Sequence, residues 1–205
     1  MSIAPLKQEW QIQQANPMLP ASDQNAYVLF EPLLWPDWEA QLSRVLDSLD
    51  AQKLFSQTRL AQLEYSPMLI SLRRSEPAIQ LCREAMIAAP CGCLLIAPDT
   101  VETSDLMQTL RQRIIVEKGN AEVIFRFYDP RALVPLLGSM QDTQRHQFFP
   151  LLSQIQWFDK SWLSAPIIKL SSSSSTSEVV RWALSESQRN TMQTILQQWS
   201  RNQPS

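Results

Sequence analysis

Short runs of apolar residues, each long enough for one β-strand, recur along the chain. They are AYVLFEP at 26–32, MLISL at 68–72, CGCLLIA at 91–97 and QIQWFD at 154–159. The run at 91–97 is almost entirely apolar, as expected for a strand that is buried on both faces. These runs predict the strands of a buried sheet.

Between the runs, apolar residues spaced three and four apart predict helices. Ser75 precedes one such stripe and is placed to cap its first turn. The predicted helical segments cover 35–49, 75–89, a stretch that begins between Asp99 and Ser104, 129–137 and 141–152.

The sequence RIIVEKGNAEVIFRFY at 113–128 predicts a β-hairpin around Gly119 and Asn120. Alternation along its second strand separates two sets of side chains. Val123, Phe125 and Phe127 should share one face, and Ile124, Arg126 and Tyr128 the other. Arg126 is therefore expected beside Tyr128, on the solvent side of the strand.

The Asp-Pro-Arg triplet that follows is suited to the start of a helix. Asp129 can accept hydrogen bonds from the N–H groups of the first turn, and Pro130 suits the first helical position. Pro135 has no N–H to donate deeper in the helix, so we expect a kink or two short turns there.

The C-terminal region differs in composition from the rest of the chain. Residues 171–177 are all Ser or Thr, which predicts a flexible link, and Ser185–Gln188 fits a capping box. Met192, Ile195, Leu196 and Trp199 then form the apolar stripe of one more helix, which we expect to dock on the main domain.

The alternation of strands and helices, with one antiparallel hairpin, predicts an α/β (α+β) fold. We expect a mixed β-sheet flanked by helices, with a C-terminal helical appendage. The predicted parts are a domain over 1–170, a link over 171–177 and a helical segment over 178–205.

Composition restricts the possible functions. The chain is 44% apolar and 19% charged with a formal net charge of −2, which is typical of a soluble globular protein and gives no reason to expect nucleic acid as a partner. Its start lacks an apolar signal region and no run is long enough to span a bilayer, so we expect a cytoplasmic protein without a membrane partner.

The sequence also lacks the usual motifs of cofactor and metal sites. Three isolated glycines form no phosphate-binding loop, and a single histidine leaves no multi-histidine metal site. We expect no cofactor, no metal and no catalysis.

The residues that could still support catalysis or metal binding are Cys91, Cys93 and His146. Both cysteines should point to one face of their strand, as two metal ligands might, and either one could form a Cys–His nucleophilic pair with His146. Two thiolates do not complete a zinc site, and nothing in the sequence brings His146 to them. Buried structural cysteines are the favoured interpretation.

Tryptophan is abundant, with seven residues in the chain. Trp157 and Trp162 lie on either side of a Phe-Asp-Lys-Ser segment. Tryptophan often anchors protein interfaces, so both are candidate partner contacts, although filling the core is the alternative.

The segment FRFYDPR at 125–131 resembles the signature of the type VI secretion effector-adaptor family, catalogued as domain of unknown function 4123. The resemblance extends over about 26–160. It includes AYVLFE at 26–31, SPMLISL at 66–72 with Met68 in place of the usual aromatic residue, the leucines Leu133, Leu136 and Leu137, the pair Phe148-Phe149, and Trp157. The family often has a His-Leu-Arg triplet before the hairpin, whereas this chain has Thr109-Leu110-Arg111.

This resemblance implies a cytoplasmic chaperone or adaptor without catalysis. Such a protein binds a cognate toxic effector, commonly its N-terminal region, and helps load it onto the VgrG spike. Two alternatives remain: an immunity-type protein that neutralises a toxin, and a small thiol hydrolase.

Within the resembling segment, Arg126, Tyr128, Asp129 and Arg131 are the candidate partner contacts, together with Trp157 and Trp162. The competing interpretation assigns Arg126, Asp129 and Arg131 to capping and a local ion pair, and we favour that interpretation because an N-cap alone explains Asp129.

Overall fold

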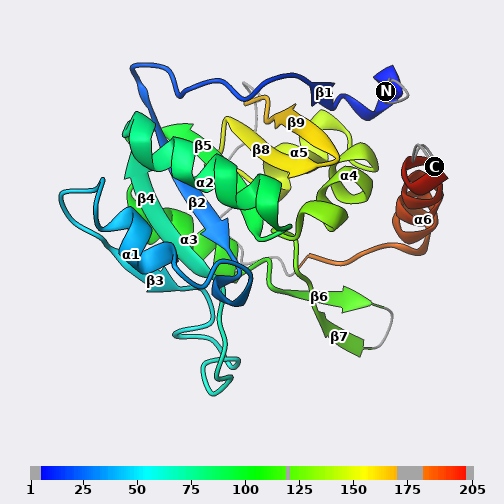
Figure 1. Cartoon of the computed structure of the whole chain (residues 1–205). Coiled ribbons are helices and arrows are strands. Elements are labelled where there is room, and N and C mark those ends of the chain that lie inside the picture. Colours follow the sequence, from blue (N-terminus) through cyan, green and yellow to red (C-terminus); the bar gives the residue numbers. More distant parts are fainter. Residues whose placement is uncertain (1–5, 119–120, 170–181, 202–205) are drawn as a thin grey trace.

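A computed structural model describes residues 6–118, 121–169 and 182–201. At its centre is a seven-stranded antiparallel sheet with the strand order β1-β9-β8-β5-β2-β4-β3 (Figure 1). Its strands are β1 (Gln13–Gln14), β2 (Gln24–Phe30), β3 (Ala51–Lys53), β4 (Met68–Arg73), β5 (Gly92–Pro98), β8 (Gln154–Asp159) and β9 (Ser161–Pro166). Strands β6 (Ile115–Lys118) and β7 (Ala121–Ile124) form a separate two-stranded sheet, the predicted hairpin. Gly119 and Asn120, the predicted turn, lie outside the described residues.

Helices cover both faces of the large sheet. They are α1 (Trp38–Leu42), α2 (Glu76–Ala88), α3 (Thr103–Arg111), α4 (Pro130–Gly138), α5 (Asp142–Phe148) and α6 (Glu186–Arg201), with short 3-10 helices at Gln8–Trp10 and Pro32–Leu34. Helices α1 and α2 pack with Val28 and Leu94 on one face, whereas α3, α4 and α5 pack with Leu29 and Leu95 on the other. The central strands are therefore buried on both faces, which explains their almost continuous apolar sequences and confirms the α+β class.

The order of the strands explains why the sequence suggested a mixed sheet. Strands β4 and β5, joined through α2, both pair antiparallel with β2, so they run parallel to each other but lie on either side of it. The strand–helix–strand pattern was thus detected correctly, yet all pairings between the described strands are antiparallel.

Some predicted elements have different bounds in the structure. The helix predicted for 35–49 is shortened to α1 and a following turn, because the chain has to reverse before it enters β3. Strand β9 was missed because its sequence, SWLSAP, lacks the β-branched residues that mark strands. Of the two outcomes expected at Pro135, the two short turns are not found: α4 is one helix that continues through this residue, with Leu133, Leu136 and Leu137 fully buried.

The C-terminal helix docks on the domain, as expected. Ile195 and Trp199 are buried, and a Cβ atom added to Gly138 of α4 would lie 3.3 Å from the Ile195 side chain. The Trp199 indole donates a hydrogen bond to Asp159 at 2.6 Å, and Lys160 donates to the Trp199 carbonyl at 2.9 Å. Ser185 accepts a hydrogen bond from the backbone of Gln188, which is the first half of the predicted capping box. The predicted Ser/Thr link at 171–177 lies outside the described residues.

A buried arginine of α5, Arg145, joins this helix to the end of α4 and to the N-terminal segment. The Arg145 side chain is fully buried and donates to the carbonyl oxygens of Leu137 at the end of α4 and of Trp10 and Gln11 near the N-terminus. Burial lowers the pKa of this guanidinium, although Asp142 opposes the shift. Its hydrogen bonds satisfy carbonyl groups that would otherwise be buried without partners.

We predict that Arg145→Met destabilises the fold by about 3 kcal/mol, because the variant leaves carbonyl groups of α4 and of the N-terminal segment without their hydrogen-bond donor. Urea unfolding measures this as a lower transition midpoint. The exposed Arg44 provides a matched control, and Arg44→Met should change stability by no more than about 0.5 kcal/mol. Equal midpoints for the two variants would contradict the role given to Arg145.

Candidate partner-binding site

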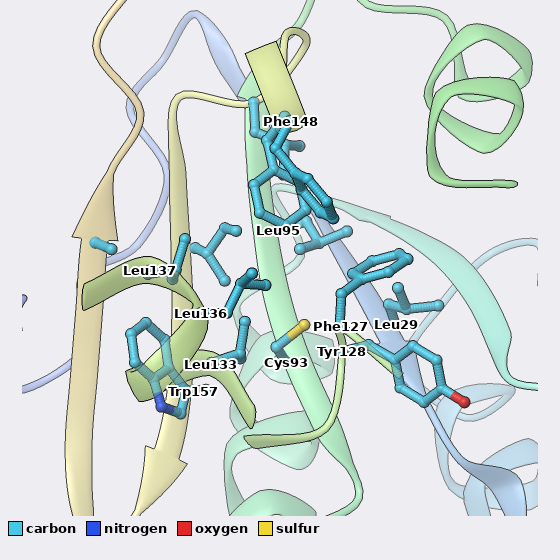
Figure 2. Packing of buried hydrophobic residues seen from close by; sticks show 14 of the residues in the cluster. Leu29, Cys93, Leu95, Phe127, Tyr128, Leu133, Leu136, Leu137, Phe148 and Trp157 are labelled. Carbon is cyan, nitrogen blue, oxygen red and sulfur yellow. The ribbon is translucent and has the colours of Figure 1, made fainter. Parts of the chain in front are cut away.

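The FRFYDPR segment connects the hairpin to α4. Strand β7 ends at Ile124, and the chain then turns, with the Asp129 N–H bonded to the Arg126 carbonyl at 3.0 Å. The predicted strand through Tyr128 is therefore too long. Because of this turn, Phe127 and Tyr128 are both buried rather than placed on opposite sides of a strand (Figure 2).

Phe127 anchors the segment in the core. Its ring makes edge-to-face contacts with Tyr128, Phe148 and Phe149 at centroid distances of 5.7, 6.0 and 5.8 Å. Figure 2 shows Phe127 beside Leu29 of β2 and Phe148 beside Leu95 of β5, with the Tyr128 hydroxyl directed away from the other labelled rings. The buried aromatic rings thus hold a short charged segment at the surface in one position.

Arg126 lies beside Tyr128, as the sequence predicted. Its guanidinium lies 5.7 Å from the centre of the Tyr128 ring and 3.3 Å from a Glu31 carboxylate oxygen at the end of β2. Burial raises the pKa of Glu31, and the positive charge of Arg126 opposes that shift. The arginine side chain is about half exposed, so it remains accessible to a partner.

Asp129 caps α4, which confirms the prediction. Its carboxylate accepts a hydrogen bond from the Arg131 N–H at 3.0 Å and forms two more with the Arg131 guanidinium, at 2.9 and 2.7 Å. Burial alone would raise the pKa of Asp129, but the hydrogen bonds and charge of Arg131, together with the charge of Arg126, outweigh it and hold the pKa below its usual value. The Arg131 side chain itself is 64% exposed.

An apolar groove of about 380 Å³ opens beside this cap, between α4 and α6. We call it the motif groove. Its lining residues are Asp129, Arg131, Ala132, Pro135, Met192, Gln193 and Leu196. Leu196, a member of the predicted apolar stripe, is 46% exposed here instead of buried against α4. The groove therefore places exposed apolar surface next to a fixed ion pair, a combination suited to a protein contact.

The remaining candidate residues do not join this surface. Tyr128 and Trp157 are buried in the core, so a partner that binds the folded domain cannot reach their rings. Trp162 is only partly buried, but it packs beside Phe158 on the α2 face of the sheet, opposite the face that holds Phe127. Of the predicted partner contacts, Arg126 and Arg131 are the most accessible near the motif groove. The groove was missed because it joins helices that are distant in the sequence.

The cysteines do not form a site. Cys91 and Cys93 belong to core clusters on opposite faces of the sheet, so the prediction of a shared face is wrong. Cys91 precedes β5, where its N–H bonds to the Ala89 carbonyl, and it does not follow the alternation of the strand. Both cysteines and Cys82 are buried free thiols, which confirms the core interpretation. Burial raises the pKa of all three, to about 11 for Cys91, and this disfavours the reactive thiolate.

His146 lies in α5 and is partly exposed. Over the residues that the structure describes, no group of three or more histidine, cysteine, aspartate or glutamate side chains is arranged to hold a metal ion. Within the same part of the chain, no helix combines the length and the apolar character needed to cross a bilayer.

Comparison with known proteins identifies one family. The model of the family described as "Domain of unknown function (DUF4123)" matches residues 26–147, more than half of the chain. The matched region extends from β2 into α5 and includes the whole FRFYDPR segment. No curated protein and no solved structure matches the chain significantly.

We predict that Asp129→Ala destabilises the protein by about 1 kcal/mol through loss of the helix cap, whereas Asp129→Asn, which can still cap, loses less stability. Urea unfolding of the two variants at neutral pH measures this difference.

The pKa of Asp129 is lowered by folding, so its carboxylate stabilises the folded state above the pKa of the unfolded chain. That stabilisation is lost as the pH falls through the folded-state pKa. Urea titrations below about pH 4 should therefore show a smaller loss of stability in Asp129→Asn than in the wild type. Parallel pH profiles for these two proteins would refute this assignment.

We also predict that the three thiols do not react with a thiol reagent in the folded protein at about pH 8, because they are buried and protonated. All three should react after unfolding in guanidinium chloride. Rapid modification of a thiol in the folded protein would contradict this burial and would favour the alternative that the protein is a small thiol hydrolase.

Proposed function

Because the chain belongs to the DUF4123 family, we propose that it is a type VI secretion adaptor. In this role it binds a cognate effector in the cytoplasm, through the N-terminal region of that effector, and helps load it onto the VgrG spike. The adaptor acts through protein–protein contacts and carries out no reaction.

The observation that carries this proposal is the presentation of the FRFYDPR segment. Buried Phe127 and Tyr128 fix its backbone, while Arg126 and Arg131 stay accessible above the core. The motif groove adds exposed apolar surface directly beside Asp129 and Arg131. A rigid charged segment next to an apolar groove offers both an orienting contact and a site that excludes water, which are the two features of a specific interface.

The proposed function predicts co-purification with an effector and a VgrG protein encoded in the same gene cluster. Leu196→Asp, which places a charge in the motif groove, should weaken effector binding about tenfold, as measured by calorimetric titration. Ile87→Asp on α2 is the matched control, because Ile87 is an exposed apolar residue of a helix on the other face of the sheet.

The outcomes separate the possible explanations. If the wild-type chain binds neither protein, the adaptor function fails. If it binds and both variants bind equally, the motif groove is not the contact. Gene deletion distinguishes an adaptor from an immunity protein: loss of the adaptor stops effector export, whereas loss of immunity poisons the producing cell.

A further inference from the structure

A second, larger groove lies away from the motif groove and shares no residue with it. It has a volume of about 800 Å³ and lies between the β3–β4 loop, α3 and the start of β6. We call it the polar groove. Its lining residues are Gln52, Gln57, Thr58, Arg59, Ser104, Met107, Gln108, Arg111, Gln112 and Ile115. In Figure 1 the β3–β4 loop projects on the same side of the molecule as the β6–β7 hairpin.

The loop that forms one wall is held in a defined conformation. Residues 54–67 connect β3 to β4 without a helix or strand of their own, and loops of this length are commonly functional. Arg111 of α3 fixes the loop by donating hydrogen bonds to the Gln57 side chain at 2.9 Å, the Ser56 hydroxyl at 2.7 Å and the Leu54 carbonyl at 3.2 Å. Gln57 has a φ of 60°, a left-handed conformation that is unfavourable for glutamine and that these contacts maintain.

Both charged residues that line the groove are arginines, and the nearby carboxylates of Asp50 and Glu122 are bonded to the lining residues Gln52 and Arg59 and not to Arg111. Arg59 forms an ion pair with Glu122 at 2.6 Å. The acceptors of Arg111 are amide, hydroxyl and carbonyl oxygens, so in the described part of the chain its positive charge is not neutralised by an ion pair. A negatively charged group that enters the groove is therefore attracted to Arg111.

The other polar groups suit a polypeptide main chain. Gln108 and Gln112 each present an amide that can donate and accept hydrogen bonds. The Gln57 amide oxygen already accepts from Arg111 at 2.9 Å and the Gln52 amide already donates to Asp50 at 3.1 Å, so each of these two keeps only part of its hydrogen-bonding capacity for a ligand. An extended peptide offers the same alternation of N–H and C=O groups along its length. Arginine and glutamine together thus match an extended segment that carries carboxylate side chains.

We propose that the polar groove binds an extended acidic segment of a partner protein, with Arg111 attracting its carboxylates and the glutamine amides binding its main chain. The inference does not depend on the adaptor function and concerns a different surface. Nucleic acid fits the groove less well, because its affinity comes from several arginine or lysine contacts to phosphates. This groove contains two arginines, one of them already paired, in a chain with a net charge of −2.

Fluorescence anisotropy with the full chain tests the proposal. The probe is a short fluorescein-labelled peptide in which glutamate alternates with serine, and the comparison peptide has lysine in place of glutamate. We expect saturable binding of the glutamate peptide alone, weakened by added salt. A single-stranded DNA oligonucleotide is titrated in parallel.

Variants of an exposed lining residue assign the binding to the groove. Gln108 is exposed on α3, so Gln108→Glu should fold normally and weaken binding about fivefold by repulsion, whereas Gln108→Lys should tighten it. Gln197→Glu, at an exposed position of α6, adds the same charge elsewhere and should leave the affinity unchanged.

Three results would overturn the proposal: no binding of the glutamate peptide, equal effects of Gln108→Glu and Gln197→Glu, or tighter binding of the oligonucleotide than of the peptide. Because the probe is a synthetic peptide, none of these results alters the outcome of the co-purification with effector and VgrG.

Discussion

Burial of the adjacent Phe127 and Tyr128 rings is the constraint on which the motif surface depends. The chain arrives from a two-stranded hairpin that projects from the large sheet, and it has to enter α4 within a few residues. The contacts of Phe127 with Tyr128, Phe148 and Phe149 fix the point of entry. Asp129 then caps the helix and Pro130 begins it, so that Arg126 and Arg131 can only lie on the outside. The packing of the core thus determines where Arg126, Asp129 and Arg131 lie on the surface.

The other end of α4 is held by a different kind of contact. Arg145 joins the last turn of α4 to the N-terminal segment, and Arg113 donates to the carbonyls of Gln147 and Phe148 in the last turn of α5. These arginines are buried, and carbonyl oxygens, not carboxylates, accept their hydrogen bonds. Because these hydrogen bonds are directional, those of Arg145 fix how α5 lies against the end of α4 and the N-terminal segment. Because α6 packs on α4, the shape of the motif groove depends on Arg145 as well.

The sequence predicted what is encoded locally and failed where distant segments meet. The buried strand at 91–97, the Ser75 cap and the Asp129 cap are all local patterns, and the structure contains each of them. The place of β2 between β4 and β5 is not local, so the antiparallel character of the sheet could not be inferred from the alternation of elements. For the same reason Arg145, within a polar helical stretch, gave no sign of burial. The polar groove joins α3, β6 and a loop more than forty residues earlier, and no pattern along the chain links them.

The two grooves differ in how charge acts in them. Beside the motif groove, Asp129 pairs with Arg131, and Arg126 pairs with Glu31, so opposite charges largely cancel at short range. A partner that binds there gains little from long-range attraction and depends on the fit of its apolar side chains to Pro135, Met192 and Leu196. In the polar groove, the charge of Arg111 is held by neutral acceptors and acts on an approaching ligand. Salt should therefore weaken binding at the polar groove and have little effect at the motif groove, because screening acts only where charge is left unbalanced.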